Sequence, residues 1–296
     1  MSRLHLAGII PIANLKTDFD LLIPEVLLPI AAGFSAIQKS VFECAMAGCN
    51  TIWIVANDDL APVVRDTIGD WVYDPVYYHS PAKYSSEQRK EIPIYYVPIH
   101  PKDRDRRDSY GWSVLYGIHC AWRVAHNISQ WITPDKYYIS FPLSAFDVYQ
   151  VRTWRREISD PKKNFFFTHN QSYIKNNLPI SFTMTGEDFK LCRRTVNQKT
   201  TREYLPPSPG QQYPSQKLPL QDRWSARYFN LEDVFEAIDE TNAHKVELDW
   251  YDDISSWDGY RNFLSSGNII NTPEEGLTKR HTHVKLPYRE GEINDD

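Results

Sequence analysis

The chain has 296 residues, of which 38 are acidic and 33 basic, and its formal net charge is -5 at pH 7. At roughly 150 residues per domain, this length fits two domains or one large α/β domain with a small appendage. Because the charge balance leaves no broad basic field, we exclude nonspecific binding to duplex nucleic acid as the main activity. The 42% of hydrophobic residues supply enough core for folding without disulfide or metal staples.

The first third of the sequence has the pattern of a βαβ unit. Residues 6–12 form a short continuous apolar run, which is typical of a strand buried on both faces. Residues 36–46 place apolar side chains on one helical face, and Gly48 is a natural end for that helix. The β-branched run 51–56 then predicts a second strand. This order predicts parallel pairing of the two strands with a right-handed crossover.

The alternation of strands and helices continues toward residue 150. We expect a helix at 60–68, a strand at 92–99, a helix at 112–131 and a strand at 136–141. Two prolines in 92–99 favour an edge position or an irregular end for that strand. The predicted fold is therefore α/β: an open, mostly parallel Rossmann-like sheet with helices on both faces, plus an irregular C-terminal extension.

The second half of the sequence divides the chain further. We expect an α/β core over 1–150, the remainder of the α/β domain over 151–271, and a charged, mobile tail over 272–296. Five prolines with Ser, Gln and Gly predict a long loop or arm at 199–221. Helices are expected at 231–241, with Asn230 as its N-cap, and around 257–264.

The four cysteines and the apolar runs indicate the compartment. The spacing of the cysteines fits neither a paired zinc ribbon nor a secreted disulfide framework, so we expect free thiols at Cys44, Cys49, Cys120 and Cys192. The N-terminal residues lack the apolar run of a signal peptide, and no stretch reaches the roughly 18 apolar residues of a membrane span. We therefore expect a cytoplasmic protein with no membrane partner.

Four segments of the first half resemble sugar-phosphate nucleotidyltransferases. These are the apolar run 6–12, the segment Ile-Pro-Glu-Val-Leu-Leu-Pro-Ile at 23–30, the helix end at 45–50 and the strand with its polar end at 51–58. The resemblance implies the nucleotide-diphosphosugar transferase fold, which is GT-A-like. It also implies transfer of a nucleoside monophosphate from an NTP to a sugar phosphate, with Mg²⁺ as the cofactor and pyrophosphate as the product.

A second resemblance lies near the C-terminus. The segment 250–260 is similar to the family's Trp-x-Asp-x-Gly-Thr segment, which implies a catalytic, metal-binding role for Asp253. Attack of one anion on another needs a divalent cation, and Mg²⁺ is bound by one or two carboxylates together with phosphate oxygens and water. The second carboxylate of the family is replaced by Ser140, Phe141 and Pro142, and Asp147 follows five residues later as the candidate. The competing interpretation is that Asp252 and Asp253 cap the helix that follows.

Other family features are missing. Residues 13–20 contain no glycine where the family has its phosphate loop, so backbone amides lose their close approach to a triphosphate. Glu25 stands where the family has a catalytic lysine, which reverses the charge. These departures leave open a second function, that of a non-catalytic descendant acting as a binding or assembly module. Its aromatic surface would support a homo-oligomer or a protein assembly.

The charged segment 101–113 offers compensating contacts to a nucleotide. We expect phosphate binding from its arginines, with Arg107 in the catalytic set, and stacking on a base or sugar from its aromatic residues; the candidates are Arg104, Arg106, Arg107, Tyr110 and Trp112. Asn57 and Asp58 are expected as polar contacts at a strand end. The alternative is a solvated loop in which Arg and Asp side chains pair with one another.

Three other chemistries are disfavoured, two by missing motifs and one by the position of its residues on the charged tail. The sequence contains neither the Gly-x-Ser-x-Gly nucleophile elbow nor a GxxxxGK[ST] phosphate loop. His281 and His283 on the charged tail are expected to be solvated and not metal ligands.

The chain also broadly resembles nucleotidyltransferase-like proteins of large marine phages, which implies the host cytoplasm or the virion as its location.

Overall fold

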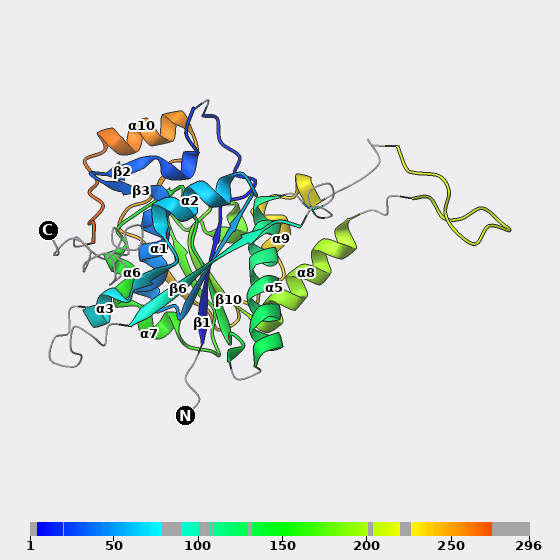
Figure 1. Ribbon diagram of the computed structural model, residues 1–296, viewed down its shortest axis with the longest axis horizontal. Helices are drawn as coiled ribbons and strands as arrows, with labels where there is room; N and C mark the ends of the chain where they lie inside the picture. The colour runs from blue at the N-terminus through cyan, green and yellow to red at the C-terminus, as the bar shows by residue number, and fades with distance from the viewer. Residues whose placement is uncertain are drawn as a thin grey trace, which may run out of the picture.

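An eight-stranded sheet organises the computed structural model, which describes residues 5–19, 21–78, 90–100, 103, 107, 109–129, 132–200, 204–219 and 226–273 (Figure 1). Within these residues the strand order is β11 (His244–Glu247), β9 (Phe165–Thr168), β10 (Phe182–Thr185), β7 (Lys136–Ile139), β1 (Leu6–Pro11), β4 (Thr51–Ala56), β6 (Glu91–Pro98) and β5 (Trp71–Tyr73). The four middle strands, from β7 to β6, are parallel, while β10 and β5 pair antiparallel with their neighbours. The predicted open, mostly parallel α/β sheet is confirmed.

Helices cover both faces of the sheet, as the alternation of side chains along β1 requires. Leu6 and Ile10 belong to the apolar core on the side of α1 (Ala36–Ala47), and Ala7 and Ile9 belong to the core on the side of α5 (Tyr110–Ile128). The two helices lie on opposite sides of β1 (Figure 1).

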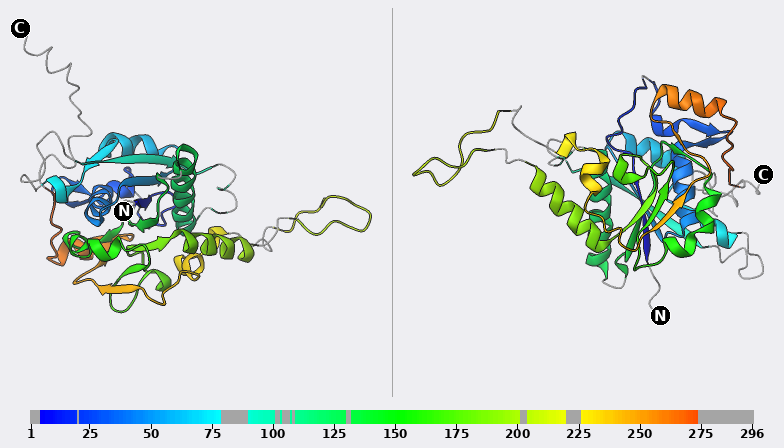
Figure 2. Two further views of the ribbon diagram at one scale, coloured as in Figure 1. Left: turned by 90° about the horizontal axis from the view of Figure 1, so that it is seen from below. Right: turned by 180° about the vertical axis from the view of Figure 1, so that it is seen from behind.

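Further helices extend each layer, and Figure 2 shows them from two other directions. On the side of α1 are α2 (Leu60–Ile68), α3 (Pro75–Tyr78), α6 (Tyr149–Thr153) and α7 (Arg155–Ile158). On the side of α5 are α8 (Gly186–Lys199) and α9 (Leu231–Phe235). Outside the sheet, α10 (Trp257–Ser265) lies near the small hairpin of β2 (Pro29–Ala31) and β3 (Phe34–Ser35) (Figure 1).

Local signals account for the boundaries of α1. Ser35 caps the helix through a reciprocal capping box with Gln38, which satisfies amide groups that the first turn leaves unpaired. Gly48 ends the helix with φ of 92°, a left-handed conformation that strains residues with a side chain. The predicted elements at 36–46, 51–56, 60–68, 112–131 and 257–264 all appear, each within a few residues of its expected bounds.

One expectation needs correction, and one holds for part of its strand. The helix predicted at 231–241 ends at Phe235, because the buried side chains of Asn164 and Asp188 bind the backbone of Asp239 and turn the chain. Among the described strands, β5 pairs only with the first three residues of β6. Residues 94–98 pair with β4 on one side and form the outer edge of the sheet on the other, which is the edge position that the prolines favour.

The proline-rich segment and the tail are described in part. Residues 204–219 form a long loop that extends away from the sheet, with Tyr204 and Lys217 bridged across its base (Figure 1). Residues 274–296 lie outside the described residues, and so do His281 and His283. In the part of the chain that the structure describes, no helix has both the length and the apolar content needed to cross a membrane.

The close packing of α5 on the sheet gives a test of the fold. A Cβ atom added at Gly117 would lie 2.6 Å from Val55 Cγ2 and 2.9 Å from Ile9 Cγ2. We expect Gly117→Ala to lower the free energy of unfolding by about 1–3 kcal/mol, because overpacking outweighs the helix propensity of alanine. Gly186→Ala at the start of α8 is the matched control, since no atom lies within 4 Å of its added Cβ. Equal midpoints of the two variants in urea unfolding would contradict this packing.

Candidate functional site

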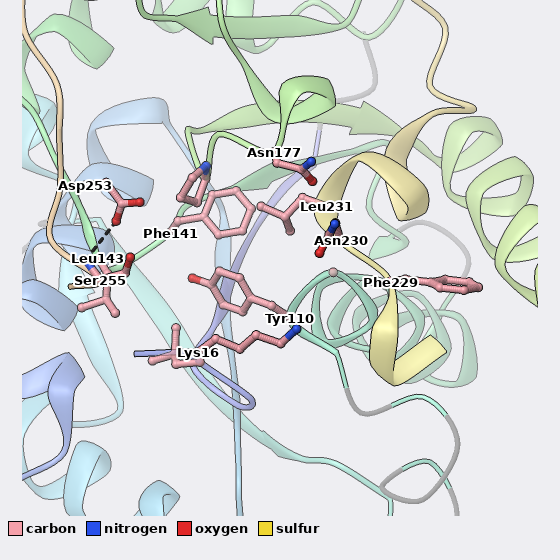
Figure 3. A pocket seen from close by; sticks show the side chains of 13 residues that line it. Lys16, Tyr110, Phe141, Leu143, Asn177, Phe229, Asn230, Leu231, Asp253 and Ser255 are labelled. Carbon is pink, nitrogen blue, oxygen red and sulfur yellow. Dashed lines mark hydrogen bonds between the residues drawn. The ribbon is translucent and has the colours of Figure 1, made fainter. Parts of the chain in front are cut away.

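A cavity of about 320 Å³ opens where the parallel strands β1 and β7 end. Its walls come from six separate segments: the chain after β1, the start of α5, the chain after β7, the loop at 177–179, the residues before α9, and the end of β12 (Asp252–Asp253) with Ser255. The carboxyl ends of parallel strands meet at one edge of a sheet, which is where α/β proteins bind ligands. Apolar and polar side chains share the lining about equally (Figure 3).

The charged groups of the cavity are one cation and one carboxylate, among the lining residues that the structure describes. Lys16 comes from the segment that follows β1, where Asn14 turns the chain with φ of 60°. Asp253 comes from the opposite wall, and Asn177 and Asn230 add carboxamides near the start of α9 (Figure 3). The chemistry of this set matches a ligand that carries hydroxyl or amide groups and a single anionic group near Lys16.

The alternation of side chains along a strand determines which aspartate faces the cavity. β12 pairs antiparallel with β8 (Ser144–Ala145), and Asp253 lies opposite Ser144. Successive side chains of a strand point to opposite sides, so Asp252 turns away and accepts a hydrogen bond from Asn268 Nδ2 at 2.9 Å. Asp253 lines the cavity and accepts a hydrogen bond from the Ser255 amide through Oδ1 at 2.9 Å.

Tyr110 supplies a buried hydroxyl group whose hydrogen bond is unmade. It is the first residue of α5, and its Oη has no partner among the described atoms. The phenol points toward the side of the cavity that holds Asp253 and Ser255 (Figure 3). Burial raises the pKa of Tyr110, and the negative charge of Asp253 raises it further, so the hydroxyl stays protonated and can donate. A buried donor without an acceptor costs free energy, which a ligand oxygen would recover.

A second phenol, that of Tyr251, adjoins this wall. Burial, followed by the charge of Asp253, raises its pKa well above the ordinary value. Its hydroxyl lies 3.4 Å from the Pro179 carbonyl oxygen, to which it donates. The charge of Asp253 thus raises the pKa of two phenols, both of which stay protonated.

Tyr110 and Asp253 are the two sequence candidates that the structure brings together in this cavity. Trp112 is 4% exposed and packs in the core beneath α5, so its ring does not line the cavity. Arg107 also lies outside the lining; it stacks on Trp112 at 4.7 Å and pairs with Asp103 at 3.8 Å, as the alternative of Arg and Asp pairing expected. Arg104 and Arg106 lie outside the described residues.

The remaining candidates lie elsewhere. Asp147 accepts a hydrogen bond from the amide of Tyr149 at 3.1 Å and does not line the cavity. The carbonyl of Asn57 accepts from two amides at the start of α2, and Asp58 lines a separate, open hollow with Arg65 and Tyr96. Across the described residues, no group of three or more His, Cys, Asp or Glu side chains is placed to hold a metal ion.

Sequence reasoning named only Tyr110 and Asp253 among the lining residues as site candidates, and three of the polar residues that it missed are instructive. Lys16 lies in the glycine-free segment 13–20, and its positive charge is the signal in the sequence that points to it. Asn177 adopts φ of 62°, and an asparagine beside a turn is the residue that most readily accepts this conformation after glycine. Asn230 is predicted as a helix cap, and it is the N-cap of α9. It also lines the cavity together with the loop at 177–179, which the sequence does not place beside it.

Two solved structures are similar to this chain over most of its length. One is a protein described as a glucose-1-phosphate thymidylyltransferase from Bacillus anthracis in complex with sucrose, with 11% identity, a TM-score of 0.55, and coverage of 91% of this chain and 98% of that one. The other is a UDP-glucose pyrophosphorylase complexed with UDP-glucose, with 12% identity, a TM-score of 0.53, and coverage of 89% and 98%.

The chain has the fold of the sugar-phosphate nucleotidyltransferases. This confirms the fold implied by the resemblance of its N-terminal segments. At such identities the likeness is one of fold, and it assigns no substrate to the chain. The sequence matches no protein-family model and no curated protein sequence.

The unmade hydrogen bond of Tyr110 gives a prediction for the ligand-free protein. We expect Tyr110→Phe to leave the free energy of unfolding unchanged or to raise it, because the variant removes a buried donor that has no acceptor. Tyr138→Phe is the matched control, since its hydroxyl donates to Glu43 at 2.7 Å, and its loss should cost about 1–3 kcal/mol. Thermal unfolding of both variants checks this, and a Tyr110→Phe protein as unstable as the control would contradict it.

Proposed function

We propose that this chain is a divergent nucleotidyltransferase that binds a sugar phosphate or a nucleotide in the cavity at the carboxyl ends of β1 and β7. The observation that carries the proposal is the meeting of Asp253 and the unpartnered Tyr110 hydroxyl in a cavity of this fold. Lys16 is the phosphate contact, and Tyr110 and the two asparagines bind hydroxyl or amide groups. UDP-glucose and sucrose are bound by proteins of the same fold.

A divalent cation fits the cavity through Asp253. Mg²⁺ takes one or two carboxylates and completes its shell with phosphate oxygens and water, so a single carboxylate suffices when the ligand carries phosphate. When bound, such an ion screens the charge between two phosphate groups that react. The residues of this chain would then have three tasks: Asp253 would hold the ion, Lys16 would orient the phosphate, and Tyr110 would donate a hydrogen bond to a ligand oxygen.

Ligand binding without transfer is the second candidate function. Glu25 replaces the lysine of the family and accepts a hydrogen bond from Thr17 Oγ1 at 3.1 Å, so this position carries a carboxylate and offers no positive charge. A protein that keeps the cavity and lacks the lysine of the family would bind a sugar phosphate or nucleotide and leave it unchanged. Proteins of this kind serve as binding modules.

Transfer is tested with each NTP, MgCl₂ and a panel of sugar phosphates, with pyrophosphate as the readout. We expect release that falls at least about a hundredfold in Asp253→Asn, because the carboxylate that holds the cation is lost. Asp252→Asn is the matched control, since its side chain faces Asn268 and not the cavity. Absence of release together with unchanged thermal stability in every nucleotide and sugar phosphate would contradict both candidate functions. Thermal stabilisation without release would favour the binding module.

The charge of Lys16 separates a phosphate ligand from a neutral sugar. We expect Lys16→Gln to raise the Kd for glucose 1-phosphate about fivefold, the size of a charge contact near solvent, and to leave the Kd for glucose unchanged. Titration calorimetry at low and high salt measures both ligands. An equal change for the two sugars would show that Lys16 does not contact the phosphate.

A further inference from the structure

Two charged side chains lie fully buried in the middle of α1, beneath the cavity. Lys39 and Glu43 are each 0% exposed, and Lys39 Nζ lies 2.8 Å from Glu43 Oε2. Removing two charges from water costs about as much free energy as their attraction returns, so such a pair contributes little to stability by itself. The groups that surround it indicate what else it does.

Glu43 binds the sheet. Its two carboxylate oxygens accept hydrogen bonds from Tyr138 Oη at 2.7 Å and from Ser140 Oγ at 2.8 Å, in and just after β7. The hydroxyl of Ser181, next to β10, donates to the same carboxylate. All these donors are buried, and together they fasten α1 to two neighbouring strands.

Lys39 binds the chain that leaves β7. Its ammonium group donates to the Phe141 carbonyl oxygen at 3.2 Å and to Ser144 Oγ at 3.1 Å, and it also lies 4.4 Å from the centre of the Phe146 ring. With Glu43 as the third acceptor, all three N–H groups of the ammonium are used. Ser144 Oγ in turn donates to the Phe141 carbonyl at 2.6 Å, which closes a turn at 141–144.

This turn is part of the cavity wall. Phe141 and Leu143 line the cavity, and the Leu143 carbonyl accepts the amide of Ile254 at 2.9 Å. Ser144 pairs with Asp253 in the short ladder of β8 and β12. The ammonium of Lys39 is therefore two contacts away from the carboxylate that faces the ligand space.

We propose that Lys39 and Glu43 are positioning residues, which hold the turn 141–144 against α1 and thereby fix Phe141, Leu143 and Asp253 in the cavity wall. The consequence for ligand binding rests on the proposed function, whereas the effect on the wall does not. A fully satisfied buried polar network has a single arrangement, because any shift leaves a charge unpaired. The apolar residues that could replace it would pack in several ways.

The test compares two buried serines at opposite ends of the network. Ser144→Ala removes the contact of Lys39 with the turn, and Ser181→Ala removes a donor to Glu43 on the sheet side; both side chains are 0% exposed. Amide hydrogen exchange, followed by NMR in the ligand-free protein, reports opening of the wall at Ile254. We expect exchange at Ile254 to rise about tenfold in Ser144→Ala relative to Ser181→Ala, with urea unfolding used to correct both for global stability.

A second variant keeps the test independent of Ser144. Lys39→Met with Glu43→Gln removes both charges at nearly constant volume and leaves no buried charge unpaired. The same rise in exchange at Ile254 is expected, together with weaker binding of glucose 1-phosphate in the presence of MgCl₂. Unchanged exchange at Ile254 in either variant would overturn the positioning role. Increased exchange in both, with no binding of glucose 1-phosphate or UDP-glucose by the unmodified protein, would support the role and contradict the proposed function.

Discussion

The burial of β1 on both faces and both edges is the constraint on which the rest of the structure depends. The strand pairs in parallel with β4 and β7, and apolar side chains cover it from the sides of α1 and α5. Gly8 and Gly117 mark how closely the two helices approach, because an added Cβ at either position would lie within 3.0 Å of a neighbouring side chain. There is no room along the strand, and the cavity lies beyond its carboxyl end, where α/β proteins bind ligands.

The segments that leave the strands convert this edge into a cavity. The chain after β1 supplies Lys16, the start of α5 supplies Tyr110, and the ladder of β8 and β12 brings Asp253 from far along the sequence. The walls are largely carbon, so electrostatic interactions inside are stronger than they would be in water. The proposed ligand, a sugar phosphate or a nucleotide, would meet one cation and one carboxylate among the described lining residues.

The sequence predicted those features whose causes are local. The stop at Gly48 and the apolar run of β4 depend on neighbouring residues, and the structure has them where expected. The end of α9 depends on Asn164 and Asp188, which lie more than forty residues earlier, so periodicity gave too long a helix there. Long-range contacts of this kind leave no local signal.

Only part of the candidate site could be predicted, because most of its residues are brought together by long-range contacts. Trp112 lies two positions after Tyr110 in the helix, which is about 200° around its axis. Tyr110 therefore faces the cavity and Trp112 faces the core. The resemblance at 250–260 located Asp253, because a short motif carries its position with it. Lys16 and Asn177 lie on irregular chain between elements, where composition indicates a loop and does not indicate which side chains converge.

The location of the ligand is the central claim, and NMR titration of the ¹⁵N-labelled protein tests it most directly. Glucose 1-phosphate and UDP-glucose are added in turn with MgCl₂, and the shifted amide signals are mapped onto the structure. The account predicts that the largest shifts fall around the cavity, at Lys16, Gly111, Asn177 and Asp253. Shifts confined to the separate hollow of Asp58, Arg65 and Tyr96, or no shifts at millimolar ligand, would contradict it.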